Sequence, residues 1–212
     1  MSTIQFYDNA DFPWIPKLEA ATDAIRQEML ALDPDEDFGV WPRPDMVKEA
    51  WEIHPLIVPG TKPNPGWATC PNTMKALQKV NGVKMAVFSK LRAGAEILPH
   101  TGYTKAVLKA HLPLVIPAQS SVDDCAIQVI ETKRTWSEGK VLLFDDKMPH
   151  QAYNRTNTDR VLLIFEVLRP WKHRTSALGF IRQRTFTPRD YIHHYQLIAR
   201  EAKWTWPDQT PA

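Results

Sequence analysis

Cysteine is scarce in this 212-residue chain, which holds only Cys70 and Cys125. Two cysteines are too few for a disulfide framework, so the sequence favours a reducing cytoplasm, although a single bridge stays open. No apolar run approaches the roughly 18 residues of a membrane-spanning helix, and the start MSTIQFYDNADFPW has no basic segment before an apolar core. We therefore expect a cytoplasmic protein without an integral membrane segment or a targeting signal.

Net charge and glycine are also low. The chain has 26 Lys and Arg against 24 Asp and Glu, and its net charge of +2 gives no reason to expect nucleic acid as a partner. Only 8 glycines occur beside 18 prolines, many of which interrupt short apolar runs such as HLPLVIPA. This pattern favours strands and loops over long helices. A mainly β protein follows, with a length that suits one domain.

The first 82 residues are expected to form a helical and irregular lead-in. An amphipathic helix is expected over Pro13–Leu32, because its apolar residues recur at spacings near three, four and seven. Those residues are Ile15, Leu18, Ile25 and Met29. The following stretch is rich in proline and tryptophan and predicts an irregular wrap, with at most one short helix near Met46–Glu52. Asn72 or Thr73 is the expected cap of a second short helix.

Residues 83–170 are expected to form the β core. Short β-rich runs recur there at intervals of about ten residues, separated by turn residues, which is typical of a sandwich or jelly roll. Beyond them, residues 171–212 read as a basic segment and a C-terminal helix, with Thr187 as its cap and Pro188 in its first turn. One domain over residues 1–212, a β core with flanking helices, accounts for the chain.

Three polar residues interrupt apolar strands of this core. Side chains alternate between the two faces of a strand, so in VLKAHLPLV Lys109 and His111 share one face. In RVLLIFEV the same alternation groups Arg160 with Leu162 and Ile164, and a guanidinium in the barrel interior needs an anion. The alternatives are a solvated strand face for the first pair and an edge salt bridge for Arg160.

Two histidines follow apolar strands at a distance of fifty residues. His100 belongs to PHTG, and His150 follows LLFDDKMP. Non-haem iron oxygenases commonly bind iron through His-X-Asp or His-X-Glu, but the third position here is Gly102, which has no side-chain ligand. Asp145 and Asp146 are candidates for an acid catalyst, a missing ligand or a turn. Whether the histidines meet depends on the fold, and each taken alone has an ordinary structural interpretation.

Two longer segments combine these signals. FSKLRAGAEILPHTGYTKAVLKAHLPLVIP and TWSEGKVLLFDDKMPHQAYNRTNTDRVLLIFEVLRP resemble the aspartyl/asparaginyl β-hydroxylase family of Fe(II)- and 2-oxoglutarate-dependent oxygenases, and the likeness extends over about residues 10–170. It implies a double-stranded β-helix, a cupin-like jelly roll. It also implies that iron is bound by His100 and His150 without a protein carboxylate, with water in the position beside Gly102.

The resemblance assigns four further residues to the co-substrate. It implies that Arg160 pairs with the distal carboxylate of 2-oxoglutarate, that Ser89 forms a hydrogen bond to the co-substrate, and that His111 contacts its other carboxylate. Lys109 departs from the family, which often has arginine there; lysine keeps the charge but not the two-pronged hydrogen bonding. O2 is the second co-substrate, and succinate and CO2 are the co-products.

The substrate is predicted less sharply than the site. The expectation is hydroxylation of an unactivated carbon, the β-carbon of an Asp or Asn residue or of a related amino acid. A lipid acyl chain, another small molecule, or a β-barrel binding protein without turnover are the alternatives. The basic segment between Lys172 and Arg184 is a candidate contact for an acidic substrate, or a solvated surface.

Overall fold

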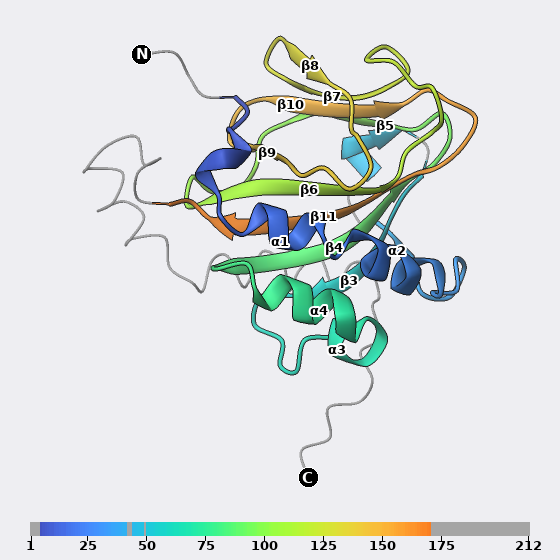
Figure 1. Ribbon diagram of the computed structural model, residues 1–212. Helices are drawn as coiled ribbons and strands as arrows, with labels where there is room; N and C mark the ends of the chain where they lie inside the picture. The colour runs from blue at the N-terminus through green and yellow to red at the C-terminus, as the bar shows by residue number, and fades with distance from the viewer. Residues whose placement is uncertain (1–4, 42–43, 49, 171–212) are drawn as a thin grey trace.

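Two antiparallel sheets face each other in the computed structural model, which describes residues 5–41, 44–48 and 50–170 (Figure 1). The six-stranded sheet has the order β1-β3-β4-β11-β6-β9, and the five-stranded sheet has the order β2-β5-β10-β7-β8. The strands of the first sheet are β1 (Gly39–Val40), β3 (Trp51–Ile57), β4 (Val83–Leu91), β6 (Val107–Val115), β9 (Leu142–Phe144) and β11 (Arg160–Leu168). Those of the second are β2 (Val47–Lys48), β5 (Glu96–His100), β7 (Cys125–Val129), β8 (Thr132–Arg134) and β10 (His150–Asn154). The expected mainly β architecture is confirmed.

The six-stranded sheet is buried on both faces. Along β11, Leu162 and Ile164 pack between the two sheets, whereas Leu163 and Phe165 pack against the helices. This alternation is the period-two geometry of a strand and agrees with the sequence pattern. One apolar core therefore lies between the sheets and a second lies under the helices.

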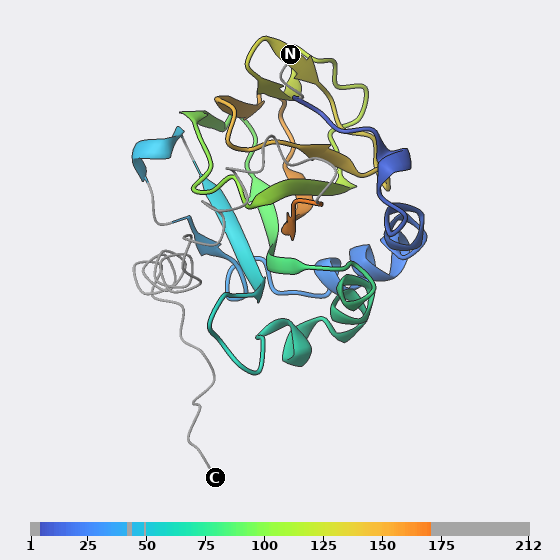
Figure 2. The same cartoon turned by 90° about the vertical axis from the view of Figure 1, so that its left-hand side faces the viewer.

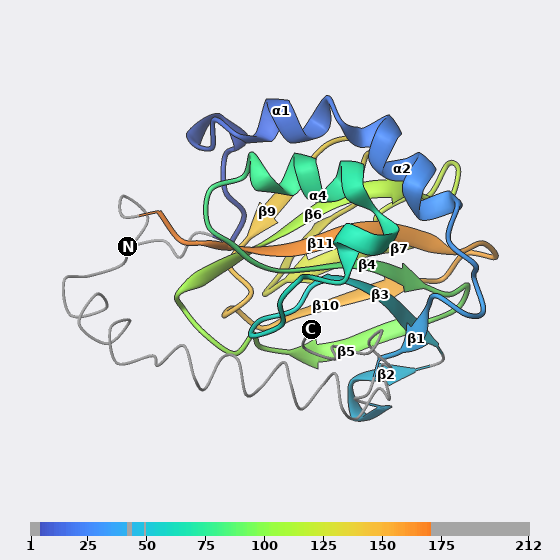
Figure 3. The ribbon, with the colours of Figure 1, turned by 90° about the horizontal axis from the view of Figure 1, so that it is seen from below.

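The helices cover the outer face of the six-stranded sheet. α1 (Ile15–Glu19), α2 (Thr22–Leu30) and α4 (Pro71–Gln78) gather on that side of the molecule (Figure 2), and Figure 3 shows them above β6, β11 and β4. Shorter elements are η1 (Asn9–Asp11), η2 (Pro44–Met46) and α3 (Gly66–Thr69). Within the part of the chain that the structure describes, no helix is long and apolar enough to cross a membrane.

The expected single helix over Pro13–Leu32 is interrupted. Helix α1 ends at Glu19 and α2 begins at Thr22, because the Thr22 hydroxyl donates to the Glu19 carbonyl at 2.6 Å and gives that carbonyl a side-chain partner. The four apolar residues that predicted the helix are nevertheless all buried. The amphipathic pattern was correct, and only the continuity was wrong.

The expected wrap with a short helix near Met46–Glu52 is also wrong. Trp51–Ile57 forms β3, which pairs with β4 along most of its length, so the sheet begins well before residue 83. Pro55 argued against a strand in the sequence, because proline lacks the N–H group that a sheet hydrogen bond needs. Its missing N–H is tolerated because β1 pairs only with Glu52 and Ile53, which leaves β3 as an edge at Pro55.

The cap of α4 comes from a distant residue rather than from Asn72 or Thr73. The Glu28 carboxylate accepts hydrogen bonds from the Asn72 and Thr73 backbone N–H groups and from the Thr73 hydroxyl, each at 2.7 Å. A carboxylate at a helix N-terminus satisfies free N–H groups and complements the helix dipole. Helix α2 is thereby joined to α4. The predicted basic segment and C-terminal helix lie outside the described residues.

Candidate active site

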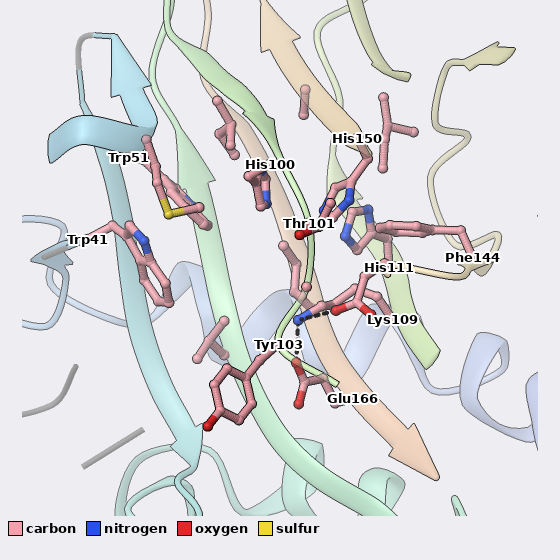
Figure 4. A pocket seen from close by; sticks show the side chains of 18 of the residues that line it. Trp41, Trp51, His100, Thr101, Tyr103, Lys109, His111, Phe144, His150 and Glu166 are labelled. Carbon is pink, nitrogen blue, oxygen red and sulfur yellow. Dashed lines mark hydrogen bonds and ion pairs between the residues drawn. The ribbon is translucent and has the colours of Figure 1, made fainter. Parts of the chain in front are cut away.

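A cavity of about 270 Å³ opens between the two sheets. Figure 4 shows its aromatic wall at Trp41 and Trp51, with His100 and His150 beside each other in the cavity lining. The apolar lining includes Trp41, Met46, Trp51, Met85, Val87 and Ile97. The polar and ionisable lining includes His100, Lys109, His111, Asp146, His150, Arg160 and Glu166. Polar and ionisable side chains from both sheets therefore meet in one cavity.

The two predicted histidines meet. His100 ends β5 and His150 begins β10, the two residues pair directly across the strands, and their ring centroids lie 4.2 Å apart. Each Nδ1 lies 2.8 Å from the carbonyl oxygen two residues earlier in the chain, that of Leu98 or Met148. A carbonyl only accepts, so each Nδ1 carries a hydrogen, and in a neutral ring the lone pair is then on Nε2.

Electrostatics keep His150 neutral. Burial, together with the neighbouring His100, lowers the pKa of His150 to about 3. A neutral imidazole with an Nε2 lone pair is the form that binds a metal ion. The donor set therefore fits a divalent transition metal held by two histidines.

A third protein ligand is absent from the described part of the chain, where no group of three or more His, Cys, Asp or Glu side chains is placed to hold a metal ion. The space beside Gly102 is taken by Asp146. The Gly102 N–H donates to the Asp146 carbonyl at 2.6 Å, and a Cβ atom at residue 102 would collide with the Asp146 carboxylate. Gly102 is thus required sterically by a carboxylate that belongs to another segment.

The two adjacent aspartates have separate roles. Asp145 accepts from the Lys147 N–H at 3.2 Å and forms a buried ion pair with Arg169 at 2.7 Å, which is the structural role considered from the sequence. Asp146 lines the cavity, and burial raises the pKa of its carboxyl to about 6. The turn interpretation therefore suits Asp145 and leaves Asp146 with a place in the site.

Arg160 is a buried cation without a protein anion. It begins β11, it is 1% exposed, and its guanidinium lies 4.9 Å from the centroid of the Trp136 ring. Its Nε and Nη2 atoms have no hydrogen-bond partner, and no ion pair forms between Arg160 and any residue that the structure describes. Burial lowers the pKa of Arg160 to about 10. The edge salt bridge is thus contradicted, and the cavity offers a site for an anionic ligand.

Lys109 and His111 lie on the same inner face of β6, as the alternation predicted; His111 is buried, and the side chain of Lys109 is only 16% exposed, so this is not a solvated face. The His111 Nδ1 accepts a hydrogen bond from Trp136 Nε1 at 3.2 Å. Indole N–H only donates, so neutral His111 carries its hydrogen on Nε2. Burial and the nearby charges of Arg160 and Lys109 hold the pKa of His111 well below its ordinary value. His111 is therefore a neutral donor in the cavity wall.

Lys109 is fully engaged with protein carboxylates. Its ammonium lies 2.5 Å from Glu166 Oε1 and 3.5 Å from Asp146 Oδ2, and Figure 4 shows the contact with Glu166. Burial alone lowers the pKa of Lys109, but the negative charges of Glu166 and Asp146 outweigh burial and raise it. Lys109 is therefore charged and paired before any ligand binds.

Ser89 is set apart from the other five predicted residues. It is fully buried, its hydroxyl accepts a hydrogen bond from Trp51 Nε1 at 2.9 Å, and it is not among the residues that line the cavity. The other five, His100, Lys109, His111, His150 and Arg160, all line it. Glu166 was missed, although it shares the inward face of β11 with Arg160, Leu162 and Ile164, and a charge on an apolar strand was the available signal.

Comparison with known proteins gives concordant results. A sequence model of the aspartyl/asparaginyl β-hydroxylase family matches residues 19–170. The ornithine lipid ester-linked acyl 2-hydroxylase of Rhizobium tropici is 34% identical over 78% of this chain and 61% of its own length. The mouse aspartyl/asparaginyl β-hydroxylase is 30% identical over 74% of this chain and 22% of its own length. The chain thus spans about three fifths and about a fifth of these two relatives.

Solved structures confirm the fold. A Pseudomonas putida prolyl-4-hydroxylase superposes with a TM-score of 0.50 over 79% of this chain and 94% of that protein, at 15% sequence identity. At this identity the likeness concerns architecture alone, and it agrees with the double-stranded β-helix expected from the sequence. The family model covers most of the chain, including both facing histidines. The chain therefore belongs to the aspartyl/asparaginyl β-hydroxylase family, whose sequence pattern it carries on a double-stranded β-helix.

Proposed function

We propose that the protein is an Fe(II)- and 2-oxoglutarate-dependent dioxygenase that hydroxylates an unactivated carbon and releases succinate and CO2. One observation carries the proposal: two facing histidines, of which His150 is held neutral, and an unpaired buried arginine line the same cavity. The first suits a divalent metal, and the second suits a carboxylate. A binding protein without turnover has no evident need for both.

His100 and His150 would hold the iron, leaving its other coordination positions to small ligands. Bound iron, 2-oxoglutarate and O2 supply the oxidising chemistry. Arg160 would hold the distal carboxylate of 2-oxoglutarate, and the His111 Nε2–H would donate to the other carboxylate. The buried walls exclude water from the reacting atoms.

Two substrate classes are supported by the family relationship. Hydroxylation at the β-carbon of an Asp or Asn residue, or of a related amino acid, corresponds to the mammalian relatives. Hydroxylation of a lipid acyl chain corresponds to the Rhizobium relative, and the apolar wall of Trp41, Met46 and Met85 favours it. The partner is a peptide, an amino acid or another small molecule in either case.

We also propose a reducing compartment, such as the cytoplasm. Cys70 and Cys125 are buried free thiols, and burial raises the pKa of Cys70 to about 11. A protonated, buried thiol is unreactive, so neither residue depends on an oxidising environment.

Anaerobic visible absorption tests the proposal without a known substrate. Purified protein is mixed with Fe(II) and 2-oxoglutarate, and a broad metal-to-ligand band is expected for the wild type. His150→Ala should abolish the band and Arg160→Met should weaken it, because they remove a ligand and the anion site. Arg155→Met, a surface arginine paired with Glu96, is the matched control and should keep it. A folded wild type without the band overturns the proposal.

A further inference from the structure

Trp136 lies behind the cavity wall and contacts two of the residues that line it. It follows β8, it is 4% exposed, and it belongs to the apolar core between the two sheets without lining the cavity itself. Its Nε1 atom lies 3.2 Å from the Nδ1 atom of His111, which is on β6. The centroid of its ring lies 4.9 Å from the guanidinium of Arg160, at the start of β11. One indole therefore joins the two residues that the proposed function assigns to the two carboxylates of 2-oxoglutarate.

The hydrogen bond from Trp136 determines which nitrogen of His111 carries the hydrogen. A neutral imidazole has one hydrogen, on either nitrogen, and an indole N–H can only donate. Accepting from Trp136 at Nδ1 leaves the hydrogen of His111 on Nε2. The ring of Phe144, 5.0 Å away, offers no hydrogen-bonding group, and the His111 ring forms no further side-chain hydrogen bond within the described ranges. The Nε2–H donor thus depends on Trp136.

The ring face of Trp136 holds Arg160 in a different way. An aromatic face attracts a guanidinium without the directed hydrogen bonds of a carboxylate. The Nε and Nη2 atoms of Arg160 accordingly keep their hydrogens available, and no described residue supplies an anion to them. A carboxylate in the place of Trp136 would pair with Arg160 and compete with an anionic ligand. Trp136 therefore orients the guanidinium and leaves it free to bind.

A single rigid side chain makes both contacts, so their geometry is linked. An indole has only two side-chain torsion angles, and close packing in the core between the sheets restricts both of them. A ligand with a carboxylate at each end needs two binding groups at a fixed separation, and a small displacement of either group weakens binding or slows the reaction. Trp136 is thus placed to keep the separation of His111 and Arg160 constant.

We propose that Trp136 is a positioning residue for 2-oxoglutarate, whose N–H group directs the His111 Nε2–H to one carboxylate while its ring face holds Arg160 for the other. The inference rests on the proposed function, because that function assigns His111 and Arg160 to the co-substrate. It adds the side chain that sets the orientation of both residues and the distance between them. Trp136 acts through these two residues and not by contact with the co-substrate.

The first experiment determines the tautomer of His111 in metal-free protein. Proton–nitrogen NMR of histidine-labelled protein at slightly alkaline pH distinguishes a protonated ring nitrogen from a bare one, and His111→Leu identifies the His111 signals. The wild type should carry the hydrogen on Nε2. Trp136→Phe keeps an aromatic ring for Arg160 but removes the N–H donor, so it should give a mixture of the two tautomers. Trp14→Phe, which changes an indole packed on Phe165 beneath the helices, is the matched control and should give the wild-type tautomer.

The second experiment measures the affinity of 2-oxoglutarate from the visible band of anaerobic protein with Fe(II). Trp136→Phe should weaken binding about tenfold, the loss of one charge-assisted hydrogen bond. Trp136→Leu should weaken it about a hundredfold, because the contact with Arg160 is lost as well. In a His111→Leu background, Trp136→Phe should cause no further loss, since it acts through His111. The control Trp14→Phe should bind 2-oxoglutarate as the wild type does.

The outcomes separate the two proposals. Absence of the band in the folded wild type refutes the proposed function. With the band present, three results overturn the inference alone: hydrogen on Nδ1 of His111 in the wild type, an unchanged tautomer in Trp136→Phe, or the same loss of 2-oxoglutarate affinity in Trp136→Phe with and without His111. The last result is that of a purely structural role, because a packing defect weakens binding in both backgrounds. The wild-type spectrum requires no change at Trp136, so a variant that fails to fold does not leave the inference undecided.

Discussion

Replacing Arg160 by methionine is expected to stabilise the ligand-free protein. Burial lowers the pKa of the guanidinium from 12.5 to about 10, and this difference corresponds to about 3 kcal/mol of destabilisation of the charged form. The full effect is present at pH 7, because the group is protonated in both the folded and the unfolded chain and the destabilisation falls only as pH rises through 10. The cation–π contact with Trp136 stabilises the folded protein by about 1–2 kcal/mol and so offsets part of this destabilisation. A methionine of similar length removes both terms.

The expected net gain is therefore about 1–2 kcal/mol, which raises the melting temperature by roughly 2–8 °C for a chain of this size. Denaturant unfolding of metal-free protein measures it, with Arg155→Met as the surface control. Addition of Fe(II) and 2-oxoglutarate without oxygen should then stabilise the wild type and the control, but not Arg160→Met. A less stable Arg160→Met protein, or one that 2-oxoglutarate stabilises as strongly as the wild type, refutes the reasoning.

Three further predictions follow from single contacts. Gly102→Asp should lower the melting temperature because the new side chain collides with the Asp146 carboxylate, and the double variant with Asp146→Gly should recover most of the loss; equal melting temperatures for the single variant and the wild type contradict the collision. Glu28→Gln should cost about 1–2 kcal/mol in denaturant unfolding, since it weakens the charged cap of α4, and an unchanged midpoint contradicts that role. Burial lowers the pKa of three histidines, including His54, so unfolding takes up protons and stability should fall as pH drops below about 6.5, with a shallower fall in His54→Gln.

The fold was accessible from the sequence wherever burial follows a regular period. Strands β6 and β11 alternate strictly, so the sequence alone correctly predicts their inward residues. The same holds for Ile15, Leu18 and Ile25 of the N-terminal helices. The spacing of apolar residues shows which face is buried, because each helical turn, or each second residue of a strand, returns to the same face.

The errors fall where a distant residue decides the local structure. Pro55 argues against a strand locally, but β1 begins only opposite Ile53, so at Pro55 β3 pairs with β4 on one side and needs no N–H donor on the other. The cap of α4 is supplied by Glu28, 45 positions before Thr73, and the residues next to the helix give no sign of it. Loop closure brings such partners together only in the folded chain, so their effect is invisible to spacing within one segment.

The same limit applies to the two cations of the cavity, which look alike in the sequence. Lys109 and Arg160 are both single charges on the inward faces of apolar strands. Glu166 is directly opposite Lys109 in the β6–β11 pairing, and Asp146 comes from the segment before β10, so Lys109 is satisfied by the fold. Arg160 pairs across the sheet with Leu91, an apolar residue, and keeps its charge uncompensated. Strand register thus distinguishes Lys109, whose charge is paired within the protein, from Arg160, whose charge has no anion among the described residues and is available to a ligand.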